Sequence, residues 1–184
     1  MIDSLFTPIH CVLHITKVGQ IVRDNRHMFL HRGAWHKFRG YAYSQLNKMR
    51  HKQAQGKRQL ITEKYGYDVK FAYHLVRLLL EVEQILTEKD LSLNRNGQQL
   101  RAIRNGEWTQ EQVIDFFHSK EKQLDELYHR CDLPAAPNEA AIKTLLLNCL
   151  EEHYGNLSDA VVIKSKADHT IKDILQILER GGYC

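Results

Sequence analysis

Long hydrophobic runs and paired cysteines are missing from this 184-residue chain. No stretch of about 18 apolar residues exists, so no membrane-spanning helix is expected. The first thirty residues carry charges and three histidines where a secretory signal needs an apolar core. The four cysteines form no C-x-x-C pair, which excludes the usual zinc ribbon and redox motifs. We therefore expect a cytoplasmic protein that has no membrane partner, no metal site and no disulfide framework.

Proline and glycine are also scarce, with three and ten residues respectively. Most segments between them follow the helical period, which predicts a mainly α protein, a helical bundle with one or two short β-strands. The strand candidates are residues 9–16, where apolar and polar residues alternate, and residues 99–104, before the Asn105-Gly106 turn. The expected division is an N-terminal strand or arm (1–19), a helical domain (20–154) and a C-terminal appendage (155–184).

Helix boundaries can be placed from capping signals and periodicity. Thr109, with Gln112 three residues later, forms a capping box that predicts a helix to about Arg130. Asn138 is a suitable N-cap for a helix over 139–154. Amphipathic or apolar patterns predict the remaining helices at 20–31, 35–51, 64–86 and near 170–180.

Positive charge is concentrated in the first third of the chain. Residues 1–58 hold 11 Lys and Arg against two acids, a balance of +9, whereas residues 59–184 hold 15 against 20, a balance of −5. Such an asymmetry is typical of a protein that binds phosphates. A solvated basic face without a polyanion partner is the alternative.

The helix expected over 64–86 is apolar around most of its circumference. The exception is a column of four side chains at i, i+3 and i+4 spacing: Lys70, His74, Arg77 and Glu81. Cationic groups on a mostly buried helix need compensation for lost hydration. Glu81 can pair with Arg77, and the column either faces water or lines a cleft that receives phosphate or carboxylate oxygens.

Four strings carry a family resemblance: FRGYAYSQLNK (38–48), KYGYDVKFAYHLVRLL (64–79), IRNGEW (103–108) and LPAAPN (133–138). Over roughly residues 5–154, the chain resembles the C-terminal half of the nucleotidyltransferases of the DNA polymerase β superfamily that are associated with RNA repair. The resemblance implies that this helical half closes against a catalytic half, with the column near the nucleotide or nucleic acid. It marks as characteristic Gly40, Tyr41, Gln45, Lys48, Tyr67, Asp68, Lys70, His74 and Arg77.

The catalytic signature of that superfamily is absent from this sequence. Nucleotidyl transfer there needs a Gly-Ser turn for the triphosphate and an Asp-x-Asp pair with a third carboxylate for two Mg²⁺ ions. No Gly-Ser dipeptide occurs, and before Gly40 the only acids are the isolated Asp3 and Asp24. The resemblance therefore implies no catalytic residue and no cofactor, with Mg²⁺ bound only if a separate catalytic chain is supplied.

The resulting hypothesis is a catalytically incomplete nucleotidyltransferase-like protein that binds a nucleotide or nucleic acid, with RNA the foremost candidate. Tyr41 would stack on a base beside cationic neighbours. The candidate phosphate-binding or nucleic-acid-binding residues are Lys70, His74, Arg77, Arg39, Tyr41, Gln45 and Lys48.

Three alternatives stay open. The chain is a subunit of a split nucleotidyltransferase whose Gly-Ser and Asp-x-Asp half is a separate polypeptide, or it is a protein-interaction or decoy protein, for example one encoded by a phage. A third alternative comes from Arg26 and His31, which match the R-x4-H spacing of HEPN-type ribonucleases.

Overall fold

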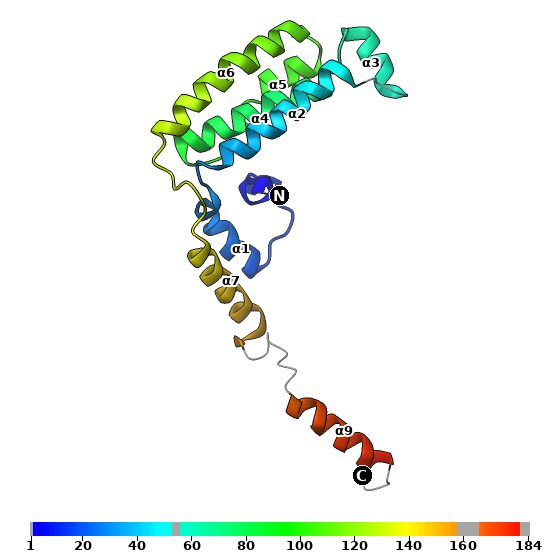
Figure 1. Cartoon of the computed structure of the whole chain (residues 1–184), viewed down its shortest axis with the longest axis vertical. Helices are drawn as coiled ribbons and strands as arrows, with labels where there is room; N and C mark the ends of the chain where they lie inside the picture. The colour runs from blue at the N-terminus through cyan, green and yellow to red at the C-terminus, as the bar shows by residue number, and fades with distance from the viewer. Residues whose placement is uncertain (1, 53–55, 158–165, 181–184) are drawn as a thin grey trace. The chain divides into compact units, whose positions relative to one another are not determined.

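The computed structural model describes residues 2–52, 56–157 and 166–180, and these residues are mainly helical, as the sequence predicts (Figure 1). The chain divides into two compact units, Met1–Lys143 and Thr144–Cys184. The elements are η1 (Ile2–Phe6), η2 (Ile9–Cys11), α1 (Lys17–Asp24), η3 (Arg26–Phe29), α2 (Ala34–His51), α3 (Lys57–Tyr65), α4 (Val69–Glu88), α5 (Gly97–Arg104), α6 (Gln110–Arg130), α7 (Glu139–Tyr154) and α9 (Lys166–Arg180).

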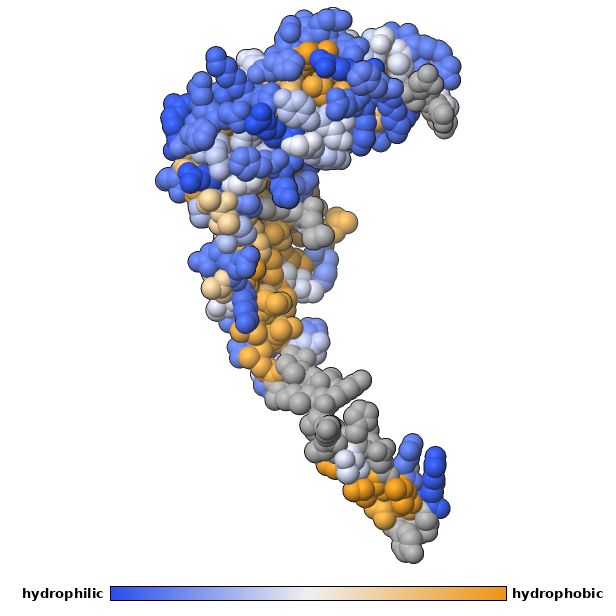
Figure 2. All heavy atoms as spheres, in the orientation of Figure 1, coloured by the Kyte–Doolittle hydropathy of each residue, from blue (hydrophilic) through white to orange (hydrophobic). Residues whose placement is uncertain are grey.

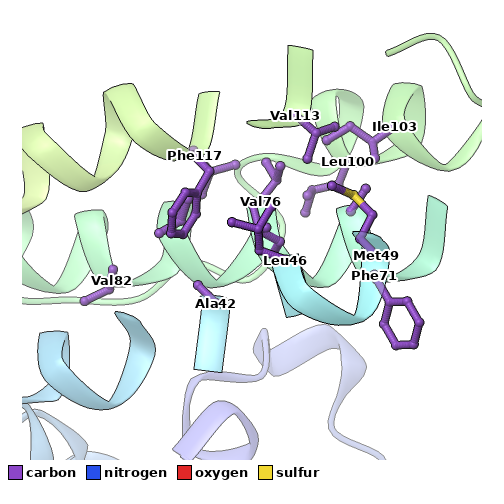
Figure 3. Packing of buried hydrophobic residues seen from close by; sticks show 14 of the residues in the cluster. Ala42, Leu46, Met49, Phe71, Val76, Val82, Leu100, Ile103, Val113 and Phe117 are labelled. Atoms are coloured by element: carbon purple, nitrogen blue, oxygen red, sulfur yellow. The ribbon is translucent and has the colours of Figure 1, made fainter. Parts of the chain in front are cut away.

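Helix α4 is the centre of the first unit. It packs against α2, α5 and α6, and most of its apolar side chains are buried. The start of α4 lies beside the end of α2, where Lys52 approaches the ring of Phe71, and α2 therefore runs antiparallel to α4. Figure 3 shows Ala42 and Leu46 of α2 with Val76 of α4 and Phe117 of α6 in one apolar cluster.

A second, smaller cluster fastens the N-terminal segment to α4. It consists of Phe6, Leu30, Ile85 and Leu91, each at most 5% exposed. Because Ile85 lies on α4, the arm that precedes α1 is fixed to the central helix by apolar burial.

Two predicted helix starts, those of α6 and α7, are confirmed, and a capping side chain also begins α4. Thr109 and Gln112 form the reciprocal capping box of α6, which ends at Arg130. The Asn138 side chain accepts a hydrogen bond from the backbone N–H of Ala141 at the start of α7. Asp68 caps α4 by accepting from the N–H of Lys70, at 3.0 Å.

The helix predicted over residues 64–86 starts later than expected. Gly66 adopts the left-handed conformation (φ 80°) and ends α3, its N–H donating to the carbonyl of Thr62. The N-cap Asp68 then begins a separate helix at Val69. A glycine with positive φ followed by a capping aspartate thus divides a segment whose apolar pattern is continuous.

Both strand predictions are wrong. Residues 9–16 form the short η2 and an irregular segment, and Ile9 and Leu13 are exposed. Residues 99–104 lie in helix α5, where Leu100 and Ile103, three residues apart, face the core. The apolar run at 160–163 lies outside the described residues.

The second unit includes apolar side chains that the described structure leaves exposed. Ile171, Ile174, Leu175 and Ile177 of α9 are each at least half exposed, and Figure 2 shows the hydrophobic colour gathered on this helix. None of the described helices combines the length and the apolar character that crossing a membrane requires.

Truncation of a core leucine should reveal the central role of α4. Leu79 of α4 is fully buried, so Leu79→Ala should lower the free energy of unfolding by about 2–5 kcal/mol, measured by urea denaturation. Leu60→Ala, in α3, is the matched control because Leu60 is 68% exposed, and its effect should stay within about 0.5 kcal/mol. Equal losses for the two variants would contradict this assignment of the core.

Candidate functional site

The predicted column on α4 divides into an exposed end and a buried end. Lys70 is exposed, His74 and Arg77 are half-buried, and Glu81 is 7% exposed. The column therefore runs from the surface at the start of α4 into the protein, and its members have different environments.

Arg77 is neutralised within the chain. Its Nε donates to Oε1 of Glu81 and its Nη2 donates to Oδ2 of Asp3, each at 2.6 Å. Burial raises the pKa of Glu81, and the hydrogen bond from Arg77 opposes that rise. The compensating anions for Arg77 are thus two carboxylates of this protein, one of which belongs to η1.

Arg77 also lines a small pocket. The pocket has a volume of about 180 Å³ and is bordered by both carboxylates that bind Arg77, by Tyr73 and by polar side chains of the α4–α5 connection. This geometry favours a structural role for Arg77, which fastens η1 to α4.

His74 shows where cations converge. Burial lowers its pKa below the ordinary value, and the positive charges of Lys70, Arg77, Arg104 and Arg58 lower it further. These four residues come from three helices, α3, α4 and α5, and they act together at one position on the surface of α4.

Two aromatic rings hold the neighbouring cations in place. Lys52 Nζ lies 5.7 Å and Arg58 Cζ 4.5 Å from the ring centroid of Phe71, and Arg104 Cζ lies 4.5 Å from that of Tyr73. Figure 3 shows the Phe71 ring pointing away from the other labelled core residues. We define the cationic patch as Lys52, Arg58, Lys70, His74 and Arg104.

Most of the positive charge in the cationic patch has no carboxylate partner. Arg58 forms an ion pair with the buried Asp68. Lys52, Lys70 and Arg104 form no ion pair with any other residue that the structure describes. An anion at the cationic patch would therefore meet cations that are not already neutralised.

The candidate residues on α2 fall into separate environments. Arg39 pairs with Glu121 at 2.8 Å and with Asp125 at 3.3 Å, and it thereby ties α2 to α6. Gln45 is buried, at 3% exposure, whereas Tyr41 is 53% exposed and Lys48 lies at the surface. Of these four, only Tyr41 and Lys48 are both accessible and free of a carboxylate partner among the described residues.

A shallow groove follows the exposed face of α2, with a volume of about 890 Å³. We call it the α2 groove, and it is lined by Gly40, Tyr43, Ser44, Asn47, Lys48, His51 and Lys52. Lys52 belongs both to the α2 groove and to the cationic patch, so the two surfaces are continuous.

Arg58 and Arg104 were not among the predicted site residues. Arg58 lies in the basic segment 51–59, and the positive charge of that segment could have identified it as a site residue. Arg104 was assigned to a strand, and only the helical conformation of α5 places it over Tyr73.

Two carboxylates of the described residues lie close together beside Arg77. Asp3 and Glu81 are the two acids that lie together in the pocket, and the guanidinium of Arg77 holds both of them. In the described part of the chain, no cluster of three or more His, Cys, Asp and Glu side chains forms a metal-binding group.

The pair behind the ribonuclease alternative is engaged in other contacts. Arg26 donates to the carbonyl of Arg23 and lies over the ring of Phe6, and His31 Nδ1 lies 3.3 Å from the carbonyl oxygen of Ala135.

Comparison with known proteins identifies the family. The fold and the site define the class of protein as a helical unit with a surface cluster of lysine, arginine and histidine. A family model, the RNA repair pathway DNA polymerase beta family (RlaP), matches residues 1–148, and the chain belongs to this family. None of the curated proteins and none of the solved structures matches the chain.

The structural role of Arg77 can be tested by removing its charge. Arg77→Leu leaves the buried Glu81 without its cation and should cost about 2 kcal/mol in unfolding free energy, less than the about 3–5 kcal/mol of a fully buried pair because Arg77 is partly exposed. The double variant Arg77→Leu/Glu81→Leu should recover part of the loss in urea denaturation. Lys89→Leu, at the exposed Lys89–Asp132 pair, is the control and should leave the urea midpoint nearly unchanged, because water screens an exposed ion pair. The role is contradicted if the double variant loses as much unfolding free energy as the single variants Arg77→Leu and Glu81→Leu lose together.

The pKa of His74 predicts the pH dependence of stability. Because that pKa is lower in the folded than in the unfolded protein, the unfolded state binds more protons once the pH falls through 6.5. Acidification should therefore destabilise the protein, and His74→Gln should make stability less dependent on pH between about pH 7.5 and pH 5.5. Urea denaturation across this range measures the effect, and parallel curves for the variant and the wild type would contradict it.

Proposed function

We propose that this protein is a catalytically incomplete, nucleotidyltransferase-like module that binds RNA through the backbone phosphates. The family to which it belongs is described as an RNA repair pathway family, which supports RNA as the ligand. The observation that carries the proposal is the position of Arg58 against Phe71 and of Arg104 against Tyr73, which brings both cations near Lys70 and His74.

The cationic patch is organised in a way that suits phosphate oxygens. Arg104 is held against Tyr73, and Arg58 is fixed by both Asp68 and Phe71, so their guanidinium groups lose little freedom when an anion binds. Phosphate would also relieve the mutual repulsion that lowers the pKa of His74. Lys52 and Lys70 add point charges at the edge of the patch.

Arg77 has no direct part in this proposal. Its guanidinium is occupied by Asp3 and Glu81, and it contributes to the site by holding α4 and η1 together. In this proposal the phosphate is bound by Lys70 and His74 of the column and by the neighbouring Arg58 and Arg104.

The proposal that the module does not catalyse nucleotidyl transfer on its own rests on the sequence. The chain has neither a Gly-Ser dipeptide nor an Asp-x-Asp string before Gly40. A separate chain that carries these groups would supply Mg²⁺ binding and catalysis, and the present module would then hold the RNA.

A second candidate function is binding to another protein. The exposed apolar residues of α9 favour it, because large apolar side chains gathered on one helix are typical of interaction surfaces. The two candidates predict different results in RNA binding, since only the first requires the cationic patch.

Binding of labelled single-stranded RNA at several salt concentrations tests the proposed function. Affinity should fall as salt rises from about 50 to 200 mM, because phosphate contacts release counterions. Lys70→Ala and Arg104→Ala should each weaken binding by about three- to tenfold and reduce the slope of log K against log salt by about 0.7. Lys143→Ala, an exposed lysine of α7, should leave both quantities unchanged.

The choice of ligand decides between the readings. Single-stranded DNA and ATP, tested beside RNA, separate a preference for RNA from simple attraction to phosphate. If no RNA binds even at low salt, the RNA proposal is wrong and the protein-binding function is favoured. If Lys143→Ala weakens binding as much as Lys70→Ala does, the cationic patch is not the binding site.

A further inference from the structure

Gly40 lies in the middle of α2, where a glycine makes a helix less stable than an alanine would. Apart from its two neighbours in the chain and the backbone of α2 itself, no described residue has an atom within 4 Å of the position that a Cβ would take at Gly40. At Gly33 and Gly106, by contrast, an added Cβ would lie 2.2 Å from the carbonyl oxygen of Ala135 and 2.0 Å from the ring of Tyr65. Packing explains those two glycines, and it does not explain Gly40.

The surface above Gly40 belongs to the α2 groove. Lys48, His51 and Lys52 line one end of the groove, and Gly40 and Tyr43 line the other. Because the missing side chain of Gly40 leaves open space, a ligand can approach the helix backbone at this position. The cationic end is continuous with the cationic patch through Lys52.

Tyr43 offers a ring that is already held in place. Its ring meets that of Phe117 edge to face, with centroids 4.8 Å apart, and its hydroxyl donates to Oε1 of Glu121 at 2.8 Å. The side chain is nevertheless 37% exposed. A fixed and partly exposed aromatic ring binds a nucleobase with little loss of side-chain freedom.

Two further side chains of the groove have free hydrogen-bonding groups. Ser44 and Asn47 lie between the cationic end and Gly40, and the side chain of neither forms a hydrogen bond with another described residue. Hydroxyl and amide groups can read the edge of an unpaired base or a ribose hydroxyl. The groove thus combines cations, polar groups and one fixed ring.

We propose that single-stranded RNA extends from the cationic patch into the α2 groove, with its phosphates against Lys48 and Lys52 and a base over Gly40 beside Tyr43. This inference rests on the proposed function, because the same RNA chain occupies both surfaces. Double-stranded RNA fits the groove less well, because its bases are stacked and paired and offer no free face to Tyr43.

The direct test fills the open space. Gly40→Leu should weaken binding of single-stranded RNA by about tenfold, the loss expected when one stacked base is displaced. Ser119→Leu is the matched control, because it places the same side chain on an exposed site of α6 outside the groove, and its affinity should equal that of the wild type. Thermal unfolding of both variants checks that they are folded.

Gly40→Ala tests whether the fold requires a glycine at position 40. Since nothing lies near the new Cβ, this variant should raise the midpoint of thermal unfolding by about 2–4 °C. A lower midpoint would show that Gly40 serves the fold, and the inference would be overturned.

Chemical protection supplies a readout that needs no variant. Bound RNA should slow acylation of Lys48 and Lys52 severalfold and leave that of Lys143 unchanged. If RNA binds and Lys70→Ala weakens it, but Gly40→Leu binds like the wild type or Lys48 stays as reactive as before, the groove assignment fails while the proposed function stands. If wild-type protein binds no RNA, the proposed function itself fails.

Discussion

The structure of the first unit depends on the burial of α4. Helices α2, α5 and α6 and the N-terminal arm cover this helix, and its polar strip from Lys70 to Glu81 has to be compensated where it enters the protein. The compensation is local: Glu81 and Asp3 bind the guanidinium of Arg77, and this places η1 against the central helix. The N-terminal arm is therefore positioned by two effects, the burial of the apolar face of α4 and the neutralisation of Arg77.

The same constraint leaves charge at the other end of the strip. Neither the side chain of Lys70 nor that of His74 forms an ion pair with a carboxylate of the described residues, and Arg58 and Arg104 extend toward them from α3 and α5. Aromatic contacts at Phe71 and Tyr73 hold the added cations close to one another in spite of their repulsion. A surface of this kind suits a polyanion, and the α2 groove extends it toward Gly40 and Tyr43.

The family assignment and the structure describe different parts of the function. Membership of an RNA repair pathway DNA polymerase beta family indicates the class of chemistry to which the chain is related. The sequence supplies no Gly-Ser turn and no Asp-x-Asp pair, and the acids that do lie together, Asp3 and Glu81, serve Arg77. A module that holds RNA for chemistry performed elsewhere accommodates both observations.

Several site residues could be found from the sequence, although their roles could not. The column of Lys70, His74 and Arg77 follows from helical spacing, and so does the pairing of Arg77 with Glu81. Asp3 lies 74 positions before Arg77, and no local rule connects them. Arg39 was predicted as a ligand for phosphate because its charge is visible in the sequence, whereas its two carboxylate partners on α6 are visible only in the fold.

The helical class and the starts of α6 and α7 follow from the sequence, because capping and periodicity act within a few residues. The sequence did not determine the state of residues 9–16 and 99–104, where a strand requires a partner that lies elsewhere in the chain. The tertiary structure alone decided which cations are neutralised and which are left free. Ion pairs and cation–π contacts depend on distances of a few ångströms between helices, and those distances are fixed by how the buried faces pack.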